Sequence, residues 1–97
     1  MPTYTIPADG TNRDIYSLEQ ARVPGYFVPS FAKLRYYAES DGIKVGGKSM
    51  TATEYDFPLL AEQRVEDGRV MTSNRYVRND SGAPVVLHVN FDLSEGP

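Results

Sequence analysis

Cysteine and tryptophan are absent from this chain of 97 residues, and histidine occurs only once. Without cysteine there is no disulfide framework, no thiolate zinc site and no cysteine nucleophile. Long apolar runs are also missing, since none approaches the roughly 20 residues that cross a bilayer. The first ten residues, MPTYTIPADG, lack the basic and apolar regions of a secretory signal. We therefore expect neither a membrane span nor a signal peptide.

Basic residues are too few and too scattered for a nucleic-acid partner. Ten lysines and arginines stand against 13 acids, the formal net charge is −3, and the isoelectric point is near 5.0. A domain that binds a duplex usually has a basic patch or a high isoelectric point. The charge balance therefore predicts no binding to nucleic acid.

The composition is that of one small globular domain. Apolar residues make up 40% and charged residues 24% of the chain, which is typical of folded rather than disordered proteins. Turn-forming residues recur about every 10–20 positions, and such spacing favours an antiparallel β fold. We predict a mainly β protein, a small antiparallel β-sandwich or open barrel with at most one short helix. We expect residues 1–10 to form an extended arm and residues 11–97 a single β domain.

The strongest pattern lies near the C-terminus. In PVVLHVNFDL, apolar residues from Val85 to Leu93 alternate with mostly polar ones, so one face of a strand is expected in the core. The turn-forming stretch RNDSGAP precedes it, and RVMTSNRYV, rich in β-branched and aromatic types, precedes that. Together these segments predict a hairpin from Arg69 to Leu93.

Two further strands are expected upstream. Leu59–Val65 is predicted as a third strand of a meander that turns at Asp67-Gly68, with a short helix from Pro58 to Gly68 as the alternative. The stretch AKLRYYAES predicts a strand that ends in a turn at Asp41-Gly42.

The best helix candidate is TNRDIYSLEQARVP, residues 11–24. Thr11 or Asn12 could cap its first turn, and Pro24 ends it. Ile15 and Leu18 would share one face of this helix.

Residues 42–49 read GIKVGGKS and match the phosphate-binding pattern G-x-x-x-x-G-K-[ST] at every position. In such a loop the backbone N–H groups surround the phosphates, the lysine contacts them, and the hydroxyl binds magnesium. The loop requires a helix directly after it, whereas the following MTATEYDFP is short, rich in threonine and ended by Pro58. The strand that ends in Asp92 resembles a magnesium-binding strand, but its alternation marks one wet face instead of burial on both. We interpret the stretch as a glycine-rich connection between strands.

No other pattern points to catalysis. His88 shares the polar face of the last strand with Asn90 and Asp92, and no G-x-S-x-G elbow accompanies it. One histidine with scattered carboxylates does not make a metal site. Several acidic residues flank predicted turns, where acidic side chains are common because they hydrogen-bond the nearby backbone. We interpret these residues as solvated: Glu54, Asp56, Glu62, Glu66 and Asp67. We predict no catalytic residue, no metal site and no cofactor.

Aromatic residues are more informative, with seven tyrosines and four phenylalanines. If Leu34 and Tyr36 face inward, the alternation of a strand turns Lys33, Arg35 and Tyr37 outward. Tyrosine and arginine are enriched at protein interfaces. The alternative is that these rings pack the core, which we favour for Tyr36, Phe27 and Phe91. For Tyr26, Arg35 and Tyr37 both interpretations stay open, and these three are candidate interaction residues.

The N-terminal arm supplies two more candidates. Tyr4 and Ile6 alternate with Thr3 and Thr5, so the arm can form a short strand between Pro2 and Pro7. Prolines confine such a strand to a sheet edge, where a second chain can pair with it. We expect pairing with a partner through Tyr4 and Ile6, and the alternative is pairing within the chain's own sheet.

These observations favour a structural or assembly protein without enzymatic activity, which contacts itself in a homo-oligomer or another protein. A virion accessory or capsid-associated component, as in a phage, is one such protein, by analogy only. The first alternative is a small β binding module or inhibitor that recognises a protein or a carbohydrate. The second is a nucleotide-binding enzyme that uses residues 42–49. We expect no nucleic-acid or membrane partner, and the cytoplasm or a virion as the location.

Overall fold

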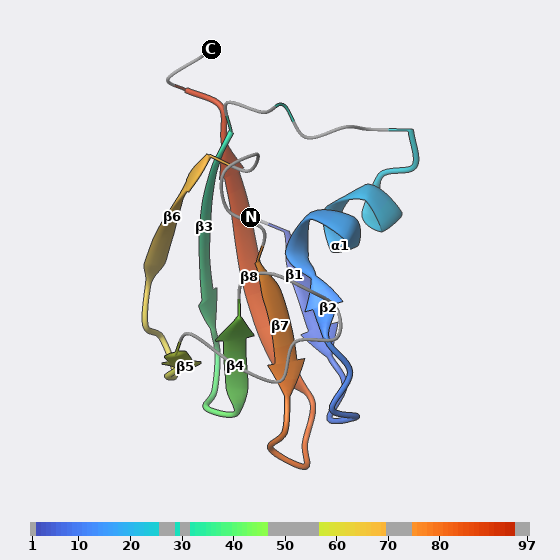
Figure 1. Ribbon diagram of the computed structural model, residues 1–97, viewed down its shortest axis with the longest axis vertical. Coiled ribbons are helices and arrows are strands. Elements are labelled where there is room, and N and C mark those ends of the chain that lie inside the picture. Colours follow the sequence, from blue (N-terminus) through green and yellow to red (C-terminus); the bar gives the residue numbers. More distant parts are fainter. Residues whose placement is uncertain (1, 26–28, 30–31, 47–56, 70–74, 95–97) are drawn as a thin grey trace.

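A computed structural model describes residues 2–25, 29, 32–46, 57–69 and 75–94, with the side chains of residues 67–69 excepted. Strands dominate these residues, and one short helix follows the second strand (Figure 1). In chain order the elements are β1 (Thr3–Ile6), β2 (Arg13–Asp14), α1 (Ile15–Arg22), β3 (Lys33–Ala38), β4 (Ile43–Gly46), β5 (Phe57–Leu59), β6 (Val65–Arg69), β7 (Tyr76–Asn79) and β8 (Val85–Asp92).

The strands form two antiparallel sheets of four strands each. The first sheet has the order β1-β8-β3-β6, and the second has the order β2-β7-β4-β5. Every pair of consecutive strands except β4 and β5 is divided between the two sheets. The strands at matching positions are β1 and β2, β8 and β7, β3 and β4, and β6 and β5, which Figure 1 shows in the same left-to-right order. This strand order is that of an eight-stranded jelly roll, a double-sheet sandwich. The prediction of a mainly β antiparallel sandwich is confirmed, and the sheets do not close into a barrel.

The core lies between the two sheets, where the apolar faces of the strands meet. On β3 the burial alternates at every residue, and Tyr36 is buried as predicted. On β8 the alternation holds as far as Val89, whereas Phe91 is only partly buried and Leu93 is 41% exposed. The buried cluster consists of Ile6, Ile15, Leu34, Tyr36, Ala38, Ile43, Val45, Leu59, Val77, Val85, Leu87 and Val89.

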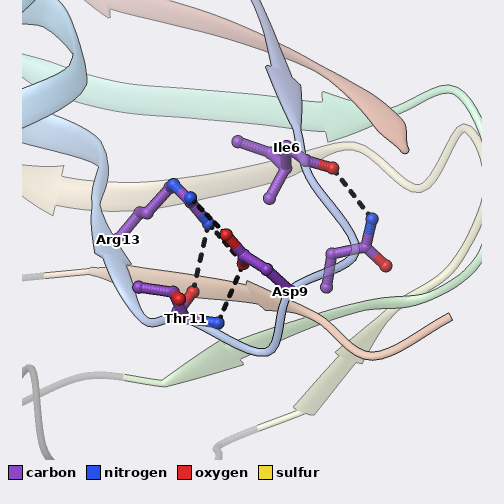
Figure 2. A network of polar contacts seen from close by, with 5 residues as sticks. Ile6, Asp9, Thr11 and Arg13 are labelled. Atoms are coloured by element: carbon purple, nitrogen blue, oxygen red, sulfur yellow. Dashed lines mark hydrogen bonds and ion pairs between the residues drawn. The ribbon is translucent and has the colours of Figure 1, made fainter. Parts of the chain in front are cut away.

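The predicted hairpin from Arg69 to Leu93 is wrong in its pairing. β7 pairs with β2 and β4, whereas β8 pairs with β1 and β3, so the two strands belong to different sheets. The buried side chain of Asn79 shapes the turn between them: its Nδ2 donates to the Ala83 carbonyl (2.7 Å), and its Oδ1 accepts from the Ser81 amide (2.9 Å). The same Nδ2 donates to the Ile6 carbonyl (2.9 Å), which ties the turn to β1 (Figure 2).

The segment Leu59–Val65 is neither the predicted strand nor the alternative helix. Leu59 ends β5 and Val65 begins β6, so residues 60–64 form a loop that crosses from the second sheet to the first. The predicted turn at Asp67-Gly68 lies inside β6. Hydrogen bonds from two amides of this loop, to the Ala38 carbonyl and to the Asp41 carboxylate, explain the difference, because they hold residues 61 and 62 against the start of the β3–β4 turn. That turn, at Asp41-Gly42, lies where it was predicted.

The helix exists but starts later than predicted. Asp14 caps α1, accepting a hydrogen bond from the Tyr16 amide at 3.1 Å, and Arg13 and Asp14 are used for β2. Thr11 instead belongs to a tight loop in which the Asp9 carboxylate binds both Arg13 and the Thr11 amide (Figure 2). The hydrogen bonds from Arg13 and Thr11 lower the pKa of Asp9.

The predicted apolar face of α1 is present. Ile15 is buried, and Leu18 packs against the core. Among the described residues no helix has the length and apolar content to cross a membrane.

Candidate functional site

The outer face of the first sheet carries the two predicted interaction residues of β3. Lys33, Arg35 and Tyr37 are all half-buried and point away from the core, as the alternation predicted. β3 lies between β8 and β6, so each of these side chains has neighbours on both sides. In the antiparallel register Tyr37 lies opposite His88. Polar and aromatic side chains therefore come together on this face.

Three flat groups lie side by side across this face. The rings of Tyr37 and His88 are parallel within 4°, with 4.4 Å between their centroids. The Cζ atom of Arg64 lies 3.8 Å from the centroid of the Tyr37 ring. The imidazole of His88 and the guanidinium of Arg64 are each too close to the Tyr37 ring to lie on the same face of it. The histidine therefore covers the face toward β8, and the arginine covers the face toward β6. We call Arg64, Tyr37 and His88 the planar stack.

Polar contacts surround the planar stack on this face. The His88 Nε2 lies 2.5 Å from a carboxylate oxygen of Glu39, just after β3. Arg35 bridges three strands, with Nε 2.8 Å from Glu66 on β6 and Nη1 2.6 Å from Asp92 on β8. The hydroxyl and amide of Ser94, together with Arg35, lower the pKa of Asp92. The charge of Arg35 is therefore matched within the chain.

A cavity of about 190 Å³ opens beside the stack, where β3 and the start of β6 separate. Arg35, Tyr37 and Arg64 line it from the outer face of the sheet, whereas Tyr36 and Val65 have their side chains in or against the core. The cavity is lined by Arg35, Tyr36, Tyr37, Arg64, Val65 and Glu66. Pockets of this kind, mostly apolar with a few polar groups at the rim, are typical ligand or partner sites.

The loop of residues 60–64 borders this cavity and is held in one conformation. The Glu62 amide donates to the Ala38 carbonyl at 2.8 Å, and the Ala61 amide donates to the Asp41 carboxylate at 2.6 Å. Glu62 has a φ of 61°, and no other non-glycine residue of the described ranges has positive φ. Leu60 is 55% exposed, although it is one of the larger apolar side chains. The loop thus combines an exposed apolar side chain with a strained backbone.

The predicted N-terminal candidates lie elsewhere. β1, inside the expected arm of residues 1–10, pairs with β8 of the same chain. The expectation that Ile6 contacts a partner is wrong, because Ile6 is fully buried in the core. Its position opposite Val85 in the register turns it inward, where the sandwich needs an apolar side chain. Of the other predicted candidates, Tyr26 lies outside the described residues, as does Phe27.

Tyr4 binds the helix instead of facing solvent. Its hydroxyl donates to Glu19 at 2.7 Å and accepts from Arg22 at 3.3 Å, and Arg22 forms an ion pair with Glu19. Burial and the bond to Glu19 raise the pKa of Tyr4 to about 12. These contacts attach α1 to β1, so the role of Tyr4 in this structure is to hold the helix.

The phosphate-binding pattern folds differently from a phosphate-binding loop. Its residues Ile43–Gly46 form β4, which pairs with β5 on one side and β7 on the other. Backbone groups used for a sheet ladder cannot surround a phosphate. The remaining residues of the pattern, 47–49, lie outside the described ranges, as do Glu54 and Asp56. Within the described ranges, no three histidine, aspartate or glutamate side chains come together as metal ligands.

Of the planar stack, only Tyr37 was among the predicted interaction residues, and Arg35 lies next to the stack. The sequence placed His88 on the polar face of the last strand, yet its side chain is only 18% exposed. Arg64 was placed in a strand or helix, and nothing in its surroundings indicated a contact with Tyr37. The register of β3 with β8 would have revealed the Tyr37–His88 pair, but a periodic pattern does not specify which strands are neighbours.

Comparison of the chain with protein-family models, with curated protein sequences and with solved structures finds no match in any of the three. A function for this chain is therefore inferred from the geometry of this site.

Proposed function

We propose that this protein is a non-enzymatic assembly module that binds a protein, either a second copy of itself or another chain, through the outer face of the first sheet. The planar stack carries this proposal. Tyrosine and arginine supply much of the binding energy in protein interfaces. Here Tyr37 is already immobilised by His88 and Arg64, so a partner would lose little side-chain entropy on binding it.

The jelly-roll topology supports a structural role. Capsid domains and lectins both use this double-sheet arrangement, although a fold alone does not determine a function. A virion accessory or capsid-associated component is the specific form of the proposal, with no nucleic-acid or membrane partner.

A carbohydrate partner is the weaker alternative for this face. Sugars are commonly bound by stacking on an open aromatic face, whereas both faces of the Tyr37 ring are covered, by His88 and by Arg64. What the stack presents to solvent is the edge of the ring and the guanidinium of Arg64. An edge and a planar cation suit a protein surface with carboxylates and apolar groups.

The solution mass of the protein tests the proposal. Sedimentation velocity over a wide concentration range should show a discrete oligomer for the wild type. Tyr37→Ala should weaken its self-association at least about tenfold, or ~1.4 kcal/mol. Lys44→Ala, on the exposed face of the second sheet, is the matched control and should leave the mass unchanged. If Tyr37→Ala and the wild type associate equally, the outer face of the first sheet is not the interface.

A further inference from the structure

We propose that the partner is a second copy of this chain and that the two copies dock reciprocally through the loop of residues 60–64. In this dimer Leu60 of each copy enters the cavity beside the planar stack of the other, and Glu62 of each copy pairs with Arg64 of the other. The inference rests on the proposed function and specifies its partner and contact residues.

Charge complementarity is the first argument. No carboxylate among the described residues forms an ion pair with Arg64, and no base among them pairs with Glu62. Arg35, the other arginine of the cavity, is already matched by Glu66 and Asp92. Glu62 and Arg64 are two positions apart and both exposed. In a two-fold symmetric contact residue i meets residue j twice, so each unmatched charge would find its opposite on the other copy.

The apolar groups of the loop give the second argument. Leu60 is more than half exposed and is one of the two large apolar side chains exposed among the described residues. The neighbouring cavity measures about 190 Å³, and the Tyr37 ring and the side chains of Arg35 and Arg64 border it on the outer face of the sheet. An apolar cavity of about 150 Å³ accepts a molecule as large as benzene, so a leucine side chain fits. A second copy therefore supplies both the side chain and the site that receives it.

The rigidity of the loop is the third argument. The Leu60 amide donates to the Gln63 side chain at 3.0 Å, and the Gln63 amide donates to the Leu60 carbonyl at 3.1 Å. Together with the bonds to Ala38 and Asp41, these contacts hold Glu62 at a φ that disfavours a side chain. Strained residues that a structure maintains against their preference are concentrated at binding sites. The strain here presents Leu60 and Glu62 in a fixed arrangement before any partner arrives.

Charge reversal at two positions tests the inference. Glu62→Arg places two arginines opposite each other at both reciprocal contacts, and Arg64→Glu places two glutamates there. Each variant alone should self-associate at least about tenfold more weakly than the wild type, because like charges face each other. An equimolar mixture of the two should form a one-to-one heterodimer, since both contacts are then attractive. The doubly substituted chain should regain the homodimer.

Native mass spectrometry and sedimentation equilibrium would measure these associations, and circular dichroism melts would verify that each variant folds. Lys44→Glu changes the net charge as Arg64→Glu does, but on the second sheet, and should associate like the wild type. Persistence of the oligomer in both single variants overturns the inference, and so does a mixture of the two that stays monomeric. If Tyr37→Ala still abolishes association in that case, the proposed function stands without this contact. A wild type that is monomeric at all concentrations overturns the dimer and the self-assembly form of the function together.

Discussion

Tyr37 and His88 lie with their rings parallel and with 4.4 Å between the ring centroids, although Tyr37 is on β3 and His88 is on β8. The contact exists because the antiparallel register places these residues directly opposite each other on the outer face of the first sheet. Arg64 covers the remaining face of the tyrosine. A surface tyrosine thereby becomes a fixed part of a site.

The stacked pair should contribute measurably to stability. We expect a double-mutant cycle between Tyr37→Ala and His88→Ala to give a coupling free energy of about 0.5–1.5 kcal/mol, the range for stacked aromatic pairs. Urea denaturation of the four proteins would measure it. Additive effects of the two substitutions would mean that the rings do not stabilise each other.

Asn79 should be one of the most sensitive polar positions. Asn79→Ala removes the side chain that donates to the Ile6 and Ala83 carbonyls and accepts from the Ser81 amide. We expect the free energy of unfolding to fall by about 1–3 kcal/mol or more, because these buried backbone groups lose their hydrogen-bond partners. Asn90→Ala, on the half-buried outer side of β8, is the control and should cost much less. Equal denaturation midpoints would contradict the assigned role of Asn79 in the turn.

Gly42 should tolerate no side chain. Its φ is 122°, and a Cβ built there would overlap the Cβ of Ser81. Gly82 also has positive φ, at 86°, but open space surrounds its Cβ direction. Gly42→Ala should therefore lower the melting temperature more than Gly82→Ala, by the equivalent of about 1–3 kcal/mol for the overlap. Similar melting temperatures would show that the turn relaxes around the added methyl group.

A substitution at Glu62 should be able to raise the stability of the monomer while it weakens self-association. Asparagine tolerates left-handed backbone better than other non-glycine residues, so Glu62→Asn should raise the unfolding free energy by about 0.5–1 kcal/mol. Glu62→Ala removes the same charge and keeps the strain, which makes it the matched control. Both variants should weaken self-association, but only Glu62→Asn should stabilise the monomer in thermal melts. A destabilised asparagine variant would contradict the strain at this position.

Tyr4 should make stability sensitive to alkaline pH. Its pKa in the folded protein is raised to about 12, whereas an unfolded tyrosine has a pKa of about 10. The stabilising contribution is therefore complete below pH ~10 and is lost as the pH rises toward the folded pKa. Absorbance titration should show that the late-titrating tyrosine fraction is smaller by one group in Tyr4→Phe, and the variant should lose less stability than the wild type over this range. A tyrosine titration unchanged by the substitution would contradict the contact with Glu19.

Local pattern in the sequence determined which face of each long strand is buried. Alternation in KLRYYA and VVLHVNFD correctly placed Tyr36 and Val89 inside and Arg35 and Tyr37 outside, because successive side chains of a strand point to opposite sides. The lack of basic and long apolar stretches likewise limited the classes of partner that we considered. These inferences need only neighbouring residues.

Only the tertiary structure decided which strands meet. β7 and β8 look like a hairpin in the sequence, yet they enter different sheets because Asn79 closes a turn that carries the chain across the sandwich. Ile6 lies in the core because it is opposite Val85 in the register of β1 with β8. Arg64 contacts Tyr37 because the loop before it is hydrogen-bonded to Ala38. Periodicity is a property of one strand, whereas pairing depends on how two apolar faces cover each other. The site therefore consists of residues whose proximity no local pattern specifies.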